Sequence, residues 1–300
     1  MRVAVIDIGT NTVLMTIADA ASGAILRDEH AIARLGEGVD KTRRISDEAY
    51  KRFAEIMRRY RGIIDELAVE RVVPFATSAM RDATNRDEVI TRTARELGYN
   101  IELLSGAEEA RWSFVGSLYG IDKLEGVVAT IDIGGGSTEV SVGHGQTFDR
   151  GTSIDIGAVR IKERFFHPMN DSNADAARAF IREQLLAATS SIESPSDLIA
   201  VAGTPTSLAA MKHKLASFDA SIVDGTVLTH EEVVTLTHEI LHISSEELTR
   251  RYPAVLASRA DILPAGALIL EEAMKALNVS SVRVSTKGLR YGVLVRELDR

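Results

Sequence analysis

The sequence predicts an α/β protein of two similar domains with a cleft between them. The chain has 300 residues, and at about 100–200 residues per domain two domains are expected. Residues 3–17 (VAVIDIGTNTVLMTI) resemble residues 128–142 (VATIDIGGGSTEVSV), since each reads as a strand ending in Asp, a short polar turn and a second strand. Strands alternate with helices elsewhere, which is typical of mixed or parallel sheets covered by helices. We expect domains at 1–121 and 122–300, with a ligand in the cleft.

The composition narrows the function classes. The chain is 45% hydrophobic and 26% charged, as is ordinary for a globular protein. It has no cysteine, which excludes disulfides, thiolate metal sites and a cysteine nucleophile. The net charge of −8 argues against sequence-blind nucleic-acid binding, although a polyanion could still bind in a local basic pocket. Because we find neither a membrane-length apolar run nor a signal peptide, we expect a cytoplasmic protein without a membrane partner.

The elements of the first half follow from cap and periodicity signals. Ser46 is a suitable N-cap with two acids behind it, and apolar residues recur at helical spacing as far as Leu67. The other predicted elements are hairpin strands at 3–8, 12–18 and 24–34, a strand at 71–77, one helix over 78–98, a strand at 101–105 and a helix at 106–120.

The second half repeats the same theme. Thr229 and Glu232 fit a capping box and predict a helix start. The final helix, 288–300, could pack back on the first domain. The other predicted elements are hairpin strands within 126–150, a helix at 172–190, a strand at 198–203 running into a helix, a helix at 261–277 and a strand at 279–285.

Both hairpin turns carry residues suited to phosphate. Glycines let backbone N–H groups point inward and an anion approach closely. An Asp at the strand end would repel phosphate, so we expect it to act through a divalent cation or a water. The alternative is a turn that needs glycine only for positive φ; the repeated Asp placement favours phosphate. The candidates are Asp7, Thr10 and Asn11 in the first turn and Asp132, Gly134, Gly135, Gly136 and Ser137 in the second.

Two strand-to-helix turns offer further contacts. Gly203 and Thr204, followed by Thr206 and Ser207, stand at a helix N-terminus, where free N–H groups favour an anion; the alternative is a capped helix with an early proline. Arg81 emerges near the matching helix start in the first half. It is a candidate bidentate phosphate clamp, or else a surface salt bridge.

Two adjacent glutamates and the Asp of a third IDIG string are the remaining residues to consider for the site. Glu108 and Glu109 are neighbours on a predicted helix, so only one of them can face a given site. That one could deprotonate a water, whereas a solvated first-turn Glu is the alternative. Asp155 ends a third IDIG string that no Gly/Ser/Thr cluster follows, and we interpret it as a turn residue.

The string HEILH at 238–242 matches the zinc-protease helix pattern H-E-x-x-H. The spacing puts His238 and His242 on one helical face, but no persuasive third ligand follows. We interpret them as two histidines of an amphipathic face.

Eight strings in order resemble one family. They are DIGTNT, ATSAMRDATN, SGAEEAR, IDIGGGSTE, GAVRI, AGTPTSLAA, RADILPAG and GLRYGVL. Together they resemble the exopolyphosphatase / guanosine pentaphosphate phosphohydrolase family over essentially the whole chain. The resemblance implies two actin-like (ribonuclease H-like) domains and hydrolysis of a terminal phosphoanhydride that depends on Mg²⁺ or another divalent cation. The expected partner is inorganic polyphosphate or guanosine pentaphosphate (pppGpp), and the expected assembly is a homodimer.

The resemblance also assigns roles. It implies that Glu109 is the general base, and that Asp132 and Glu139 position a metal ion and a water. It implies phosphate contacts by Asp7, Thr10, Asn11 and Arg81 in the first domain and by Gly134, Gly135, Gly136, Ser137, Gly203 and Thr204 in the second.

The chain also departs from the family. Tyr291 stands where members often carry Glu. Larger members continue into a C-terminal helical domain of the HD type, which we expect to be absent here. Its absence would favour short polyphosphate chains or a nucleotide as the substrate. An actin-like kinase or nucleotide-binding scaffold is the weaker alternative. Lys287, Arg290 and Arg160 are candidates for steering the polyanion, against a surface role.

Overall fold

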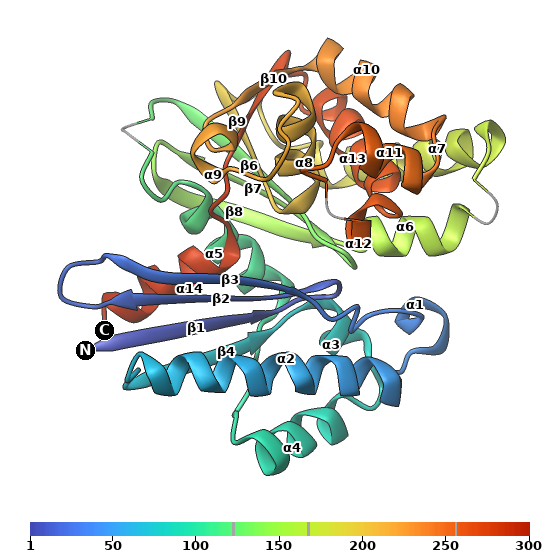
Figure 1. Ribbon diagram of the computed structural model, residues 1–300. Helices are drawn as coiled ribbons and strands as arrows, with labels where there is room; N and C mark the ends of the chain where they lie inside the picture. The colour runs from blue at the N-terminus through green and yellow to red at the C-terminus, as the bar shows by residue number, and fades with distance from the viewer. Residues whose placement is uncertain (122–123, 167–168, 256) are drawn as a thin grey trace.

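Two mixed β-sheets form the framework of the protein. The computed structural model describes residues 1–121, 124–166, 169–255 and 257–300, and Figure 1 shows the sheets in two stacked halves. The first sheet has the order β3-β2-β1-β4-β5 and the second the order β10-β11-β9-β6-β7-β8. The first sheet consists of β1 (Arg2–Ile8), β2 (Thr12–Asp19), β3 (Ile25–Ile32), β4 (Arg71–Ala76) and β5 (Glu102–Leu103). The second consists of β6 (Val127–Ile133), β7 (Thr138–His144), β8 (Thr147–Ile154), β9 (Asp197–Val201), β10 (Val227–Thr229) and β11 (Ser281–Val284).

The two sheets share one topology. In each, an antiparallel three-stranded meander continues into strands that run parallel to its first strand. β1, β2, β3, β4 and β5 therefore correspond to β6, β7, β8, β9 and β11, and β10 is an additional edge strand. The predicted α/β fold of two actin-like halves with a cleft between them is confirmed.

Helices cover both faces of each sheet. The first-half helices are α1 (Val39–Thr42), α2 (Asp47–Glu66), α3 (Ser78–Asp82), α4 (Arg86–Leu97) and α5 (Gly106–Ser117). The second-half helices are α6 (Ala158–Phe165), α7 (Asp171–Thr189), α8 (Gly203–Lys212), α9 (Ala220–Val223), α10 (His230–Leu241), α11 (Ser245–Arg251), α12 (Ala257–Ala260), α13 (Leu263–Ala276) and α14 (Leu289–Leu298). In the described parts of the chain, no helix is long and apolar enough to cross a membrane.

The predicted helix caps are confirmed. The Ser46 hydroxyl accepts from the N–H of Ala49 and begins α2, whose apolar stripe packs on the first sheet as part of one buried cluster. Thr229 and Glu232 form the reciprocal capping box that begins α10. These signals are readable from sequence because a cap involves residues only three positions apart.

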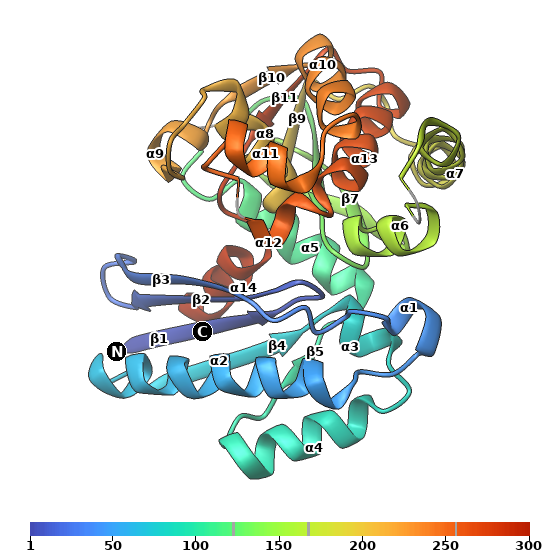
Figure 2. The ribbon, with the colours of Figure 1, turned by 45° about the vertical axis from the view of Figure 1, so that its right-hand side comes forward.

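The two halves exchange a helix where they meet. α14, the last helix of the chain, packs on β1, β2 and α5, while α5 packs on β6, β7 and β8 of the second sheet. Figures 1 and 2 both show α5 and α14 between the two sheets. Side chains of α14 complete an apolar cluster with β1 and β4, so the second face of the first sheet is covered by the far end of the chain. The domain boundary near residue 121 stays a prediction, and residues 122–123, where the second domain was expected to begin, lie outside the described residues.

One predicted element is wrong, and several short elements were missed, namely α1, α6, α9, α11, α12 and β10. The helix expected over 78–98 is two helices, α3 and α4, because Ala83 is extended and the Asn85 amide bonds both the N–H and the carbonyl of Ile45 at 3.0 Å. α6 was not predicted; it follows the turn at Asp155 directly. Tertiary hydrogen bonds, which leave little local signature, cause the first difference.

Candidate active site

The turns at the ends of the central strands surround one cavity between the halves. Its lining comes from both hairpin turns, the β4–α3 and β9–α8 turns and the first turn of α14. Of the predicted site residues, eleven line this cavity and two, Arg81 and Glu139, do not. Those lining it are Asp7, Thr10, Asn11, Glu109, Asp132, Gly134, Gly135, Gly136, Ser137, Gly203 and Thr204.

The glycine run of the second hairpin lies against the first half. A Cβ on Gly136 would lie 2.4 Å from Ser78 Oγ and 2.8 Å from Thr10 Oγ1, and a Cβ on Gly135 would lie 2.9 Å from Thr10 Cβ. Neither glycine has positive φ, so the alternative of a turn needing left-handed backbone is wrong. Because these glycines lack side chains, the second hairpin turn can lie against Thr10 and Ser78 of the first half.

Acidic side chains sit at the same place in both hairpins. Asp7 and Asp132 are each the last residue but one of their strands, β1 and β6. Ser113 on α5 donates to Asp132 Oδ2 at 2.5 Å. Burial, followed by repulsion from Glu109 and Asp132, raises the pKa of Asp7 to about 8. Burial likewise raises the pKa of Asp132, against the Ser113 hydrogen bond. Because close carboxylates repel one another, this end of the cavity favours a cation or a proton.

Helix α5 separates the roles of its two adjacent acids. Glu108 is exposed and closes a capping box with Ser105, while Glu109 is only 6% exposed and lines the cavity. Burial raises the pKa of Glu109 to about 7, which Arg81 opposes and Asp132 reinforces. A carboxylate with a pKa near neutrality is well suited to accept a proton from water, and of the two acids only Glu109 lines the cavity.

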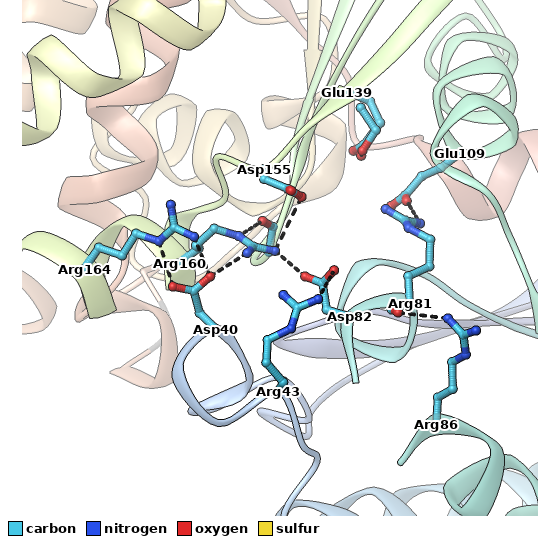
Figure 3. Close-up of polar contacts among 12 residues, drawn as sticks. Asp40, Arg43, Arg81, Asp82, Arg86, Glu109, Glu139, Asp155, Arg160 and Arg164 are labelled. Atoms are coloured by element: carbon cyan, nitrogen blue, oxygen red, sulfur yellow. Dashed lines mark hydrogen bonds and ion pairs between the residues drawn. The ribbon is translucent and has the colours of Figure 1, made fainter. Parts of the chain in front are cut away.

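Arg81 is engaged with this carboxylate. Its Nη1 hydrogen-bonds Glu109 Oε2 and also donates to the carbonyl of Leu104 at 3.2 Å; Figure 3 shows the guanidinium facing Glu109. Arg81 therefore holds Glu109 in place. The predicted clamp on phosphate stays a prediction, and in this arrangement it would have to share the guanidinium with Glu109.

Glu139 lies behind the cavity wall. It is directly opposite Asp132 in the β6–β7 ladder, so the hairpin brings the two side chains together. Glu139 is 2% exposed and accepts from Ser153 Oγ at 2.6 Å. Burial and repulsion from Glu109 and Asp132 raise its pKa well above the ordinary value. It is placed to act on Asp132 and on the polar network rather than on a ligand in the cavity.

The β9–α8 turn brings Gly203 and Thr204 to the cavity. The N-cap residue Ala202 has φ 76°, a left-handed value that costs a non-glycine residue free energy and often marks a functional site. The hydroxyls of Thr206 and Ser207 instead bond back to carbonyls of this turn, with Ser207 Oγ 2.7 Å from the oxygen of Gly203. Only the first turn of α8 therefore faces the site.

Two cations line the cavity, and the sequence assigned a role to only one. Arg290 of α14, a predicted steering residue, is joined by Arg259 of α12. Arg259 packs against Gly203, where a Cβ would lie 2.1 Å from its Cζ, and its Nη2 is 3.1 Å from Nε2 of His30. Burial lowers the pKa of Arg259 to about 10. Arg259 was quoted within the string RADILPAG, but nothing local showed that it faces the cleft.

The other predicted steering cations have protein partners. Lys287 Nζ bonds Asp224 at 2.9 Å, outside the cavity lining. Arg160 is 4% exposed and donates to the Gly136 carbonyl at 2.7 Å, and it pairs with Asp40 and Asp82 of the first half. Figure 3 shows this pairing across the cleft. The prediction that Arg160 steers a polyanion is therefore wrong, because the guanidinium is buried and joins the halves.

Among the described residues, no group of three or more His, Asp or Glu side chains could hold a metal ion. The rings of His238 on α10 and of its C-cap residue His242 lie 4.3 Å apart, outside the cavity lining. Glu239 between them accepts from the Tyr252 hydroxyl. The HEILH string is thus an amphipathic-face feature, as expected. The oxygen-only acids at the cavity do suit Mg²⁺, which commonly takes one or two carboxylates and completes its shell with water and phosphate.

The fold and the cavity define a class: a two-domain α/β protein in which a hairpin turn from each half lines one cavity between the halves. Residues 16–300 match the profile of the Ppx/GppA phosphatase family. Exopolyphosphatase 2 of Mycobacterium tuberculosis is 34% identical over 295 residues, covering 92% of this chain and 91% of the relative.

Crystal structures agree with this assignment. The Ppx/GppA family member of Aquifex aeolicus is 31% identical, with a TM-score of 0.83 over 99% of this chain and 97% of that one. An exopolyphosphatase from Cytophaga hutchinsonii is 28% identical, with a TM-score of 0.91 over 100% of this chain and 98% of that one. The chain belongs to the Ppx/GppA phosphatase family, and the family resemblance of its sequence motifs is confirmed.

Proposed function

We propose that this enzyme is an exopolyphosphatase, which hydrolyses the terminal phosphoanhydride of inorganic polyphosphate and releases orthophosphate. The observation that carries the proposal is the convergence of both hairpin turns on Glu109, a buried carboxylate whose pKa is raised to about 7. The similarity to exopolyphosphatase 2 of M. tuberculosis supports polyphosphate as the substrate.

Binding is assigned to the turns and the arginines. Backbone N–H groups of the second hairpin turn, the Thr10 hydroxyl and the first turn of α8 offer donors to phosphate oxygens. Arg259 and Arg290 add guanidinium donors to the same cavity. Polyphosphate carries charge but few other features, so binding by backbone donors and guanidinium groups suits it.

Water activation is assigned to Glu109. Its carboxylate accepts a proton as the water oxygen bonds to the terminal phosphorus, and the bond to the bridging oxygen breaks. The shortened chain leaves with the electron pair of that bond. Arg81 fixes the orientation of the carboxylate, while burial keeps the pKa high enough for proton transfer near neutrality.

A divalent cation, Mg²⁺ in this proposal, fits the acidic end of the cavity. Asp7 and Asp132 line it and both have raised pKa values, because burial disfavours their charged forms. Asp132 would hold the ion directly, with Glu139 behind it in the ladder. When bound, the ion would neutralise the charge that builds up on the phosphoryl oxygens.

The test compares substrates and two neighbouring glutamates. Orthophosphate release is measured with Mg²⁺ from tripolyphosphate, long polyphosphate, pppGpp and ATP. Glu109→Gln should lower kcat about 10²–10⁴-fold with little change in KM. Glu108→Gln is the matched control, since Gln can also close a capping box, and it should stay within about twofold of wild type.

The outcomes separate the candidate functions. Preferential release from pppGpp would move the substrate to that nucleotide at the same site. Release from none of the four would favour a kinase or a nucleotide-binding scaffold. Near-normal turnover by Glu109→Gln would refute the base assignment. The homodimer expected from the resemblance belongs to the same proposal and is measured by analytical ultracentrifugation.

A further inference from the structure

Arg290 reaches the cavity with one edge of its guanidinium already docked on the first sheet. Nε donates to Thr16 Oγ1 at 2.9 Å and Nη2 donates to Asp28 Oδ2 at 3.0 Å. Nη1 has no hydrogen-bond partner within the part of the chain that the structure describes. Because guanidinium donors are arranged in a rigid planar fork, docking one edge also fixes the direction of the other.

The carboxylate that receives Arg290 is itself held by three donors. Besides Arg290, Asp28 accepts from Thr16 Oγ1 at 2.5 Å on Oδ1 and from the Tyr291 hydroxyl at 2.9 Å on Oδ2. Thr16 on β2 and Asp28 on β3 are directly opposite each other in the ladder. The sheet register therefore sets where the carboxylate stands, and the two hydroxyls prevent it from rotating.

Tyr291 is the part of this arrangement contributed by α14. It is 6% exposed, and its ring packs against Tyr119 with centroids 5.3 Å apart. Burial, followed by the Asp28 charge, raises the pKa of Tyr291 to about 12, so the hydroxyl keeps its proton and remains a donor. Arg290 and Tyr291 are consecutive residues, yet both bond one carboxylate because Asp28 stands beside the first turn of the helix.

We propose that Asp28 and Tyr291 are positioning residues that hold the free edge of Arg290 toward a phosphate group of the polyanionic substrate. The proposal rests on the proposed function and assigns the recognition of that substrate to a preset guanidinium. The Arg290–Asp28 pair carries no net charge, so its contribution is directional donors rather than attraction at a distance. Presetting the fork removes the cost of ordering a long side chain on binding.

A double-mutant cycle tests this action through Arg290. Tyr291→Phe removes one hydroxyl and should lower kcat/KM for tripolyphosphate about 3–10-fold, mainly by raising KM. Lysine has no guanidinium fork for Tyr291 and Asp28 to hold. In an Arg290→Lys background, Tyr291→Phe should therefore change kcat/KM by less than about twofold. Equal losses in the two backgrounds, or no loss in the wild-type background, would overturn the proposal.

Tyr99→Phe is the matched control. Tyr99 is 2% exposed, its hydroxyl donates to the Met57 carbonyl at 3.3 Å, and neither residue lines the cavity. It should lose a similar amount of stability without a change in KM, which separates positioning from a general loss of packing.

A second measurement does not depend on turnover. In ¹⁵N-arginine NMR spectra, the Nε–H of Arg290 should be a sharp, slowly exchanging signal that broadens in Tyr291→Phe and Asp28→Asn but not in Tyr99→Phe. An unchanged signal would overturn the positioning role even in a fully active enzyme. If the wild-type protein releases no phosphate from polyphosphate, the proposed function fails, and broadening in these variants alone would still support the positioning role.

Discussion

The contact between α5 and α14 predicts that Gly292→Ala impairs both stability and turnover. A Cβ on Gly292 would lie 1.8 Å from the carbonyl oxygen of Trp112, and a Cβ on the facing Gly116 would lie 2.0 Å from the carbonyl oxygen of Gly288. Carbon-to-oxygen contacts are ordinarily about 3.3 Å or longer, so the helices must separate by roughly 1.5 Å. The obstructing atoms are backbone atoms, which cannot rotate away as a side chain can.

The magnitude follows from two opposing terms. Overpacking costs about 1–3 kcal/mol, and backbone obstruction places this case at the upper end. Alanine gains about 1 kcal/mol over glycine in a helix, which leaves a net loss of about 2 kcal/mol. At about 2–4 °C per kcal/mol, Tm should fall by about 4–8 °C. The helix starts carry Glu109 and Arg290, so a shift of about 1 Å should also lower kcat by about 10²-fold.

The assay pairs this variant with Gly62→Ala. Gly62 is an exposed residue of α2 whose added Cβ would meet nothing within 4 Å, so its substitution should stabilise the protein by about 0.5–1 kcal/mol. Thermal unfolding and orthophosphate release are measured for both variants. If Gly292→Ala behaves like Gly62→Ala, with a raised Tm and normal turnover, the reasoning from close helix contact is refuted.

Two further predictions concern the charges of the cleft. The pKa values of Asp7 and Glu109 are raised in the folded state, to about 8 and about 7. The folded protein therefore binds these two protons more tightly than the unfolded chain does. The stability that the two protonated carboxyl groups contribute is complete below their unfolded pKa values and is lost as the pH rises through about 7–8. In the presence of a chelator, the Tm of the wild type should fall between about pH 6 and about pH 8.5, and Mg²⁺ should restore it. Asp7→Asn should make Tm depend less steeply on pH. A difference in Tm between the wild type and Asp7→Asn that does not change with pH would contradict this prediction. Arg160→Met should destabilise the protein by about 3–5 kcal/mol by urea unfolding, because it leaves buried partners, including the Gly136 carbonyl, without their donor. The half-exposed Arg164 is the control, and Arg164→Met should cost no more than about 1 kcal/mol; similar losses in the two variants would contradict the buried role of Arg160.

The elements that local rules describe were predicted well. The two hairpins, the Ser46 and Thr229 caps and the long amphipathic helix α2 all depend on residues a few positions apart. The break between α3 and α4 was not predictable, because the Asn85 amide is satisfied by Ile45, forty residues away. Beyond the two hairpins, the pairing order of the strands was not predicted, because it is set by contacts between distant segments.

The site was predicted in its composition but only partly in its geometry. The repeated Asp and the two hairpin turns identified eight of the residues that line the cavity, and the resemblance selected Glu109 over Glu108. What sequence could not give was the set of partners: that Arg81 bonds Glu109, or that Arg160 is buried across the cleft. Each of these contacts joins segments from different elements.

The sequence by itself determined the fold class and the glycine-rich hairpin turns, because these reside in short patterns and in a repeated unit, and its family resemblance selected Glu109 as the candidate base. Only the tertiary structure decided which charges face the cavity. Arg259 and Arg290 line the cavity, whereas Lys287 and Arg160 lie outside its lining and form ion pairs with protein carboxylates. The physical reason is that a charged side chain reaches several ångströms from its backbone, so its partner is chosen by packing and burial between distant segments, and the spacing of residues along the chain does not encode that choice.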